Sequence, residues 1–307
     1  MSNYQTETEE VTAKLMNQNF IRKIEDGHVK EAAEAGTSFI RSKMRENSFT
    51  RSIITPETLT SSDLDRDAAT DDPKKIVDIE PDSRATWVPF KGMGEARYFS
   101  GPRYEIYFGK VESERFQKSK FQLMSYNMDI RQILSDNSVK DMADQEDLSF
   151  ITRVNAALPA GQILTGTGLG GATIRSGIQN LLERRIPVGK LLMTKVAHSE
   201  ILDLQSASVG DLILQRHYDD GVEKEERLWG IPVVTTIKND IVTPQGAGPN
   251  DNHSLYFFGP ENYLGNFFLL QDATLFMKQE ADIIQFHSYE SVGIGIGNTG
   301  AMCRVDI

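Results

Sequence analysis

Apolar residues recur at helical spacing through the first 46 residues of the chain. Val11, Leu15 and Phe20 belong to this stripe, which Gly27 and Gly36 interrupt. The spacing predicts amphipathic helices, and glycine inside a helix lowers its stability, so both glycines are expected to break the stripe. The stripe is too thin to form a core alone. We expect this segment to lie as an arm on another surface, the alternative being a frayed terminus.

The next apolar pattern alternates, as in strands. "KKIVDIE", "RATWVPF", "RYEIYFGKV" and "KFQLM" follow one another between positions 74 and 124. Glycines and a proline between Phe90 and Arg103 mark a turn region, which predicts a long two-stranded ribbon. Trp87, Phe90 and Tyr104 lie on its flanks and need burial. A two-stranded ribbon is marginal in water, so contact with another surface should support it.

A long helix is predicted from Ser138 to Leu158. Ser138 is placed to cap it, and apolar residues recur at helical spacing up to Pro159, over roughly 30 Å of helix. After this helix, "KLLMTKVAHSEILDL" predicts a strand that leads into a helix. Further strands are predicted at "LWGIPVVTTI", "SLYFFG", "FLLQDATLFMKQ" and "DIIQFHSYE".

The last strand pattern places glycine on one of its faces. Val292, Ile294 and Ile296 share one side, and Gly293, Gly295 and Gly297 occupy the other. Glycine weakens a strand unless another surface must approach closely. We expect this strand to form a hairpin with residues 301–307, and its glycine face to lie against a neighbouring domain or a neighbouring subunit.

Composition and charge limit the class of protein. The 307 residues are 39% hydrophobic with a formal net charge of -11, so a protein that grips phosphates is not expected. The single cysteine, Cys303, excludes an intrachain disulfide and fits a reducing cytoplasm. No run approaches the ~18 apolar residues that would cross a bilayer, so we expect no membrane partner.

Candidate chemistry is sparse. Gly166, Gly168 and Gly171 have the GxGxxG spacing of a pyrophosphate loop, but they follow a long helix and no acidic ribose ligand follows them. Asp63, Asp65 and Asp67 imitate the start of a calcium loop that then departs from the pattern. The histidines lack metal-ligand spacing. We therefore expect no catalytic, cofactor or metal residues, and a structural or binding role.

Taken in order, these segments resemble the major capsid proteins of tailed bacteriophages with the Hong Kong ninety-seven type fold. The stretch from "IVDIEPDSRATWVPFKG" to "RYEIYFGKVESERFQKSKFQLMSY" is similar to the extended ribbon, or E-loop, of that family. The 138–158 helix is similar to the spine helix of its peripheral (P) domain, and "ILTGTGLGG" to the glycine loop behind that helix. The most specific match is "LWGIPVV", at 228–234.

The resemblance implies an α+β fold with an arm and linker at 1–74 and three further parts. The E-loop ribbon is at 75–112, and the P domain with its spine helix is at 113–158, completed by 250–289. The axial (A) domain is at 159–249, completed by 290–307. The residues expected at interfaces are Trp87, Phe90, Lys91, Tyr104, Gly293, Gly295 and Gly297. Cross-linking through Lys91 is not expected, because no partner residues for it can be placed.

The implied function is that of a structural protein rather than an enzyme. Copies would form hexamers and pentamers of an icosahedral phage head around double-stranded DNA, assembled in the host cytoplasm and retained in the virion. The expected partners are the protein itself, a separate scaffolding protein, a portal, a possible decoration protein, and DNA on the inner face without sequence-specific binding. An acidic inner surface of the shell would not bind the phosphates of the DNA, so the DNA could slide along it during packaging. The alternatives are an encapsulin-type compartment shell and, from another class, a nucleotide-binding enzyme that uses Gly166, Gly168 and Gly171.

Overall fold

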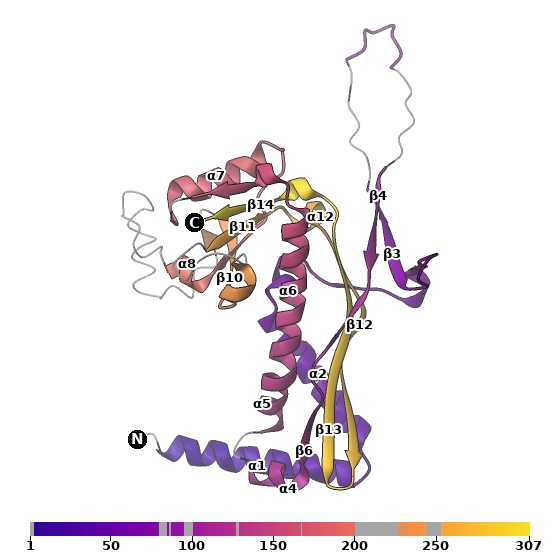
Figure 1. Cartoon of the computed structure of the whole chain (residues 1–307), viewed down its shortest axis with the longest axis vertical. Coiled ribbons are helices and arrows are strands. Elements are labelled where there is room, and N and C mark those ends of the chain that lie inside the picture. The colour runs from indigo at the N-terminus through magenta and orange to yellow at the C-terminus, as the bar shows by residue number, and fades with distance from the viewer. Residues whose placement is uncertain are drawn as a thin grey trace.

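A computed structural model gives the structure of the chain (Figure 1). It describes residues 3–79, 85, 87–94, 101–126, 129–166, 168–199, 227–228, 230–243 and 253–307. A long helix and a long hairpin run side by side through the lower part of the molecule in this view. The N-terminal helices lie at one end, a six-stranded sheet lies beside the other end, and a thin ribbon projects beyond it. The arrangement confirms the α+β class.

The N-terminal arm is helical, as predicted. Its helices are α1 (Asn3–Glu25), α2 (Val29–Asn47) and the short α3 (Phe49–Ile53). Gly27 separates the first two with a φ of 84°, in the left-handed region that glycine tolerates best. The predicted break at Gly36 is wrong, because α2 runs through it. A side chain at Gly36 would collide with Leu275, so the glycine permits close packing of α2 on the long hairpin.

The spine helix begins earlier than predicted. Helix α5 (Ile130–Leu134) continues through a π-helical turn, η2 (Ser135–Val139), into α6 (Lys140–Ala157). The assignment of Ser138 as its cap is wrong, because Ser138 is buried inside this continuous rod. The cap is Asp129, whose carboxylate accepts a hydrogen bond from the backbone N–H of Gln132 at 2.8 Å. At 1.5 Å per residue the rod is about 42 Å long.

A five-stranded sheet packs along the spine. It is built on the hairpin of β12 (Gly265–Glu280) and β13 (Ile283–Ile296). Strand β1 (Glu57–Thr58) joins β12, and β5 (Gly109–Glu112) and β6 (Phe116–Ser119) both join β13. The predicted strand at "KFQLM" is wrong, because Lys120–Ser125 form helix α4, with Ser119 and Gln122 in a capping box.

The predicted C-terminal hairpin is also wrong. Strand β13 pairs with β12 and β5, whereas β14 (Met302–Asp306) belongs to the other large sheet. The 3₁₀ turn η6 (Thr299–Ala301) carries the chain from one sheet to the other. The alternating apolar pattern therefore predicts each strand correctly. The two strands, however, pair with other strands and not with each other.

The six-stranded sheet has the order β7-β14-β11-β8-β10-β9. Its strands are β7 (Ile163–Thr165), β8 (Lys190–Thr194), β9 (Arg227–Leu228), β10 (Ile231–Thr236), β11 (Ser254–Phe258) and β14. The helices of this region are η3 (Ala160–Gln162), α7 (Gly171–Leu182), α8 (Lys195–Ser199), α11 (Asn239–Val242) and α12 (Glu261–Leu264). Helix α7 packs on the sheet, with Gly177 against the ring of Phe257.

A small three-stranded sheet forms the root of the projecting ribbon. Its order is β2-β3-β4, with β2 at Asp65–Arg66, β3 at Pro73–Asp78 and β4 at Arg103–Tyr107, and the 3₁₀ turn η1 (Ser61–Asp63) precedes β2. Of the predicted strand at 84–90, residues 85 and 87–90 are described and are not in a strand; Arg84 and Thr86 lie outside the described residues.

Candidate assembly interface

The ribbon leaves the body as two antiparallel strands. Strands β3 and β4 pair from Lys74 opposite Tyr107 to Asp78 opposite Arg103, and the backbone N–H of Ile79 donates to the carbonyl of Pro102 at 2.9 Å. The described part of the tip, residues 87–94, lies away from the rest of the molecule (Figure 1). The predicted long ribbon is thus present at its root, and contacts within the described chain support only that root.

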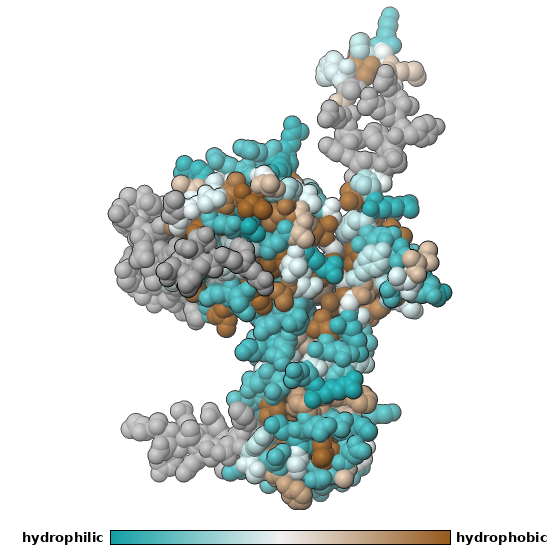
Figure 2. Space-filling view, in the orientation of Figure 1, coloured by the Kyte–Doolittle hydropathy of each residue, from teal (hydrophilic) through white to brown (hydrophobic). Residues whose placement is uncertain are grey.

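The described part of the tip exposes large apolar side chains. Trp87, Phe90 and Met93 are 99%, 110% and 96% exposed, respectively. A tight turn closes the tip, in which the N–H of Gly92 donates to the carbonyl of Pro89 at 2.7 Å. In Figure 2 this segment stands at the far end of the ribbon, clear of the bulk of the molecule. Large apolar side chains exposed to this extent on a projecting segment are typical of interaction sites.

The root of the ribbon covers the glycine face of β13. Cβ atoms added at Gly293 and Gly295 would lie 3.0 Å and 2.5 Å from side-chain atoms of Ile106, and one at Gly297 would lie 2.9 Å from Tyr104 Oη. The expected close approach is therefore real, and the approaching surface belongs to the same chain. Sequence patterning indicated the glycine face but not its occupant. A contact of these glycines with a second copy stays a prediction.

Tyr104 is the polar contact in this otherwise apolar junction. Its hydroxyl donates to Asn266 Oδ1 at 2.6 Å, which links β4 to the start of β12. Burial raises the pKa of the Tyr104 phenol, so it stays protonated and able to donate. The structure thus brings Tyr104 together with Gly295 and Gly297. The tip segment, residues 87–94, which includes Trp87, Phe90 and Lys91, lies far from them (Figure 1).

A buried cluster of charged side chains connects the end of the arm to the body of the protein. The sequence did not lead us to predict it. Nη2 of Arg51 lies 2.8 Å from Glu146 Oε2 and 2.8 Å from Glu290 Oε2, and both carboxylates are fully buried. The hydroxyl of Ser48 donates to Glu146 Oε1 at 2.5 Å. Burial disfavours the Arg51 cation, but the facing carboxylates outweigh burial and raise the pKa of Arg51. This cluster joins α3, α6 and β13.

Asp147 extends the cluster towards the six-stranded sheet. It accepts hydrogen bonds from the N–H and the hydroxyl of Thr50, at 3.0 and 2.7 Å, and it lies 2.5 Å from Lys238 Nζ. A signal was available in the sequence. Glu146 and Asp147 occupy the same helical stripe as Met142 and Phe150, where a solvated acid is not expected.

The glycine-rich loop lies between β7 and α7. A Cβ atom at Gly166 would lie 2.8 Å from Thr173 and 3.1 Å from Ile307, and Gly168 has a φ of 97°. The Thr173 hydroxyl donates to the carbonyl of Gly168 at 2.9 Å. Close packing and a left-handed turn therefore account for Gly166 and Gly168, and Gly171 begins α7.

The described residues show neither a metal-binding cluster nor a helix able to cross a bilayer. In these ranges no group of three or more His, Cys, Asp or Glu side chains is arranged to hold a metal ion. None of the helices in the same ranges combines the length and hydrophobicity that a bilayer crossing requires.

Comparison with known proteins gives a result for structure alone. No protein family model matches the sequence, and no curated protein matches it. Solved structures do match. A structure from Mycobacterium phage Ogopogo has a TM-score of 0.57 at 13% identity, covering 85% of this chain and 92% of that one. The mature capsid of bacteriophage PhiM1 has a TM-score of 0.59 at 10% identity, covering 84% and 86%. The chain has the Hong Kong ninety-seven type capsid fold.

The same fold also occurs outside phage heads. The virus-like particle from Pyrococcus furiosus matches with a TM-score of 0.53 at 14% identity, covering 90% of this chain and 99% of that one. At such identities the likeness is one of fold. The fold is therefore shared with the phage structures and with this virus-like particle.

Proposed function

We propose that this chain is a major capsid protein that assembles into hexamers and pentamers of an icosahedral phage head around double-stranded DNA. The observation that carries the proposal is the projecting ribbon. It ends in Trp87, Phe90 and Met93, which are almost fully exposed, on a chain with a capsid fold. Burial of such side chains is a main source of stability at interfaces, so a second copy is their natural partner.

We also propose the division of the chain into parts that the resemblance implies. We assign residues 1–74 to the arm and linker and 75–112 to the E-loop. The P domain takes 113–158 and 250–289, and the A domain takes 159–249 and 290–307. Strand β13 runs unbroken across the boundary at 289/290, so the return to the A domain is better drawn after Ile296.

The proposal includes partners and a place of action. Besides its own copies, the chain would contact a separate scaffolding protein, a portal and, in heads that carry one, a decoration protein, with assembly in the host cytoplasm and retention in the virion. The net charge of -11 suits an inner wall that does not hold DNA tightly. The role is structural, without catalysis.

Co-expression with the scaffolding protein tests the proposal. The expected products are closed particles or capsomer rings in negative-stain micrographs, and a compact monomer under all assembly conditions would contradict it. The match to the Pyrococcus furiosus particle favours a second candidate, an encapsulin-type shell. Nuclease-protected DNA inside purified particles supports the phage head, whereas an enclosed enzyme supports the compartment.

A further inference from the structure

A cleft of ≈ 400 Å³ lies between the spine helix and β5, the strand that follows the ribbon. The buried side chains of Val292 and Ile294, on β13, lie at its bottom. Lys110 of β5 lines one side. The other side is lined by polar residues of α6 that are four positions apart and therefore share one face of the helix: Gln145, Ser149 and Arg153.

Arg153 is a cation without a counter-ion. Its Nη1 donates to the carbonyl of Ile294 at 2.6 Å, and no carboxylate of the described residues forms an ion pair with it. Burial lowers the pKa of Arg153, because the guanidinium is partly withdrawn from water and no negative charge compensates for this. A guanidinium has five N–H donors. Most of those on Arg153 therefore have no acceptor among the described residues.

The groups beside Arg153 are also hydrogen-bond donors. The side chains of Gln145 and Ser149 make no hydrogen bond with any residue that the structure describes. Lys110 forms an ion pair with Glu112, which is the one acidic residue in the lining. The lining thus carries two cations and one carboxylate, and its apolar bottom strengthens the attraction between opposite charges. Such a cleft is suited to an anion.

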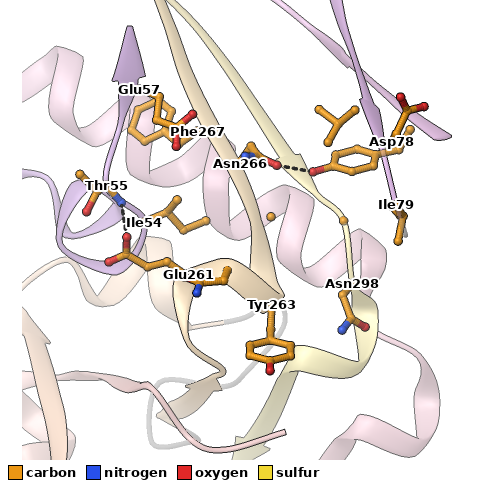
Figure 3. A pocket seen from close by; sticks show the side chains of 15 residues that line it. Ile54, Thr55, Glu57, Asp78, Ile79, Glu261, Tyr263, Asn266, Phe267 and Asn298 are labelled. Atoms are coloured by element: carbon orange, nitrogen blue, oxygen red, sulfur yellow. Dashed lines mark hydrogen bonds between the residues drawn. The ribbon is translucent and has the colours of Figure 1, made fainter. Parts of the chain in front are cut away.

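Two other cavities provide comparisons. The cavity at the ribbon root, of ≈ 500 Å³, is lined by the carboxylates of Glu57, Asp78 and Glu261 and by no cation among the described residues (Figure 3). An anion is expected to avoid it. Arg45 lines a groove on α2, is exposed and makes no ion pair with a described residue. If anions bound any accessible arginine, they would bind Arg45 as well.

We propose that the cleft binds a small oxyanion, a phosphate or a carboxylate ion, between the guanidinium of Arg153 and the ammonium of Lys110. Gln145 and Ser149 donate further hydrogen bonds to it. The planar fork of an arginine matches two oxygens of such an ion. The bound anion joins α6 to β5 and so holds the strand that follows the ribbon against the spine. One copy contains the whole site, so the proposal does not depend on the shell function.

Thermal unfolding of the full chain measures this binding. Sodium phosphate replaces sodium chloride at constant ionic strength. The saturable part of the rise in Tm gives the apparent Kd, because the general exclusion of phosphate from protein surfaces does not saturate. Arg153→Gln should raise the apparent Kd about tenfold or more and Ser149→Ala about threefold, since each removes a donor to the anion. The control Arg45→Gln should leave it within about twofold.

Chemical protection tests the site in the wild type, which keeps the proposal testable if Arg153→Gln does not fold. Phenylglyoxal modifies accessible arginines, and mass spectrometry gives the rate at each of them. Phosphate should slow the modification of Arg153 several-fold and leave that of Arg45 unchanged. Succinate is the second probe: protection by succinate alone supports a carboxylate site, and protection by phosphate alone supports a phosphate site.

Three results would overturn the proposal. They are an unchanged rate at Arg153 with both anions, equal protection of Arg153 and Arg45, and a saturable rise in Tm that Arg153→Gln retains.

Discussion

Replacing Glu290 by glutamine should make the protein more stable at pH 8 and remove much of its pH dependence. Glu290 is fully buried on β13, where it faces Arg51 of α3, Glu146 of α6 and Asp272 of β12. Burial, together with the negative charge of Glu146, raises the pKa of Glu290 from 4.5 to about 8. Glutamine has the shape of the protonated acid and cannot ionise.

The raised pKa of Glu290 sets both the direction and the size of the change in unfolding free energy with pH. The folded protein holds this proton more tightly than the unfolded chain does, so stability is fully present below pH 4.5 and is lost as the pH rises towards 8. At 1.36 kcal/mol per pKa unit, the loss is roughly 3 kcal/mol at pH 7 and approaches about 5 kcal/mol above pH 8. Glu290→Gln should therefore resemble the wild type at pH 5 and exceed it by several kcal/mol at pH 8.5.

Urea unfolding followed by circular dichroism at several pH values between 5 and 9 measures the effect. The difference between wild type and Glu290→Gln is the informative quantity, because other groups titrate in both proteins. Glu280→Gln, at the exposed end of β12, is the matched control and should leave the pH dependence unchanged. A difference that stays constant from pH 5 to 8.5 would refute the reasoning.

Three further predictions concern the Arg51 cluster and the ribbon. Arg51→Ala should cost about 3–5 kcal/mol of unfolding free energy, because the buried Glu146 carboxylate loses its cation and buried Glu290 loses a hydrogen-bond donor, whereas exposed Arg45→Ala should change it by less than about 0.5 kcal/mol. Gly295→Val should cost about 1–3 kcal/mol in urea unfolding by forcing the ribbon root away, unlike Gly109→Ala, where nothing lies within 4 Å. Replacing 88–102 by an Asn-Gly turn should preserve the circular-dichroism spectrum and melting but abolish closed shells; loss of the folded monomer would place the ribbon in the core instead.

Much of the fold is readable from local pattern. The long apolar alternation of β12 and β13, the ribbon root and the helical stripes of the arm and spine all follow from the period of their apolar residues. The pairing of the strands cannot be predicted in the same way. Residues 292–296 and 302–306 alternate in the same way, yet they pair in different sheets, because pairing depends on which strands the rest of the chain brings beside them.

The candidate interface, too, was predictable from the sequence only in part. Glycines on one face of β13 predicted a close neighbour, but only the structure identifies the ribbon root as that neighbour. The Arg51, Glu146 and Glu290 cluster was missed because charged residues are usually solvated, and their mutual contacts span up to 239 positions of the chain. Spacing within one segment carries no information about such distant partners.

The central claim is that this chain builds a closed shell through its ribbon. Electron microscopy of the protein co-expressed with its scaffolding protein, at a resolution that traces the ribbon, tests it most directly. We expect closed particles made of pentamers and hexamers, with Trp87 and Phe90 buried on an adjacent copy. Particles in which the tip stays in solvent, or a preparation that contains only monomers, would contradict it.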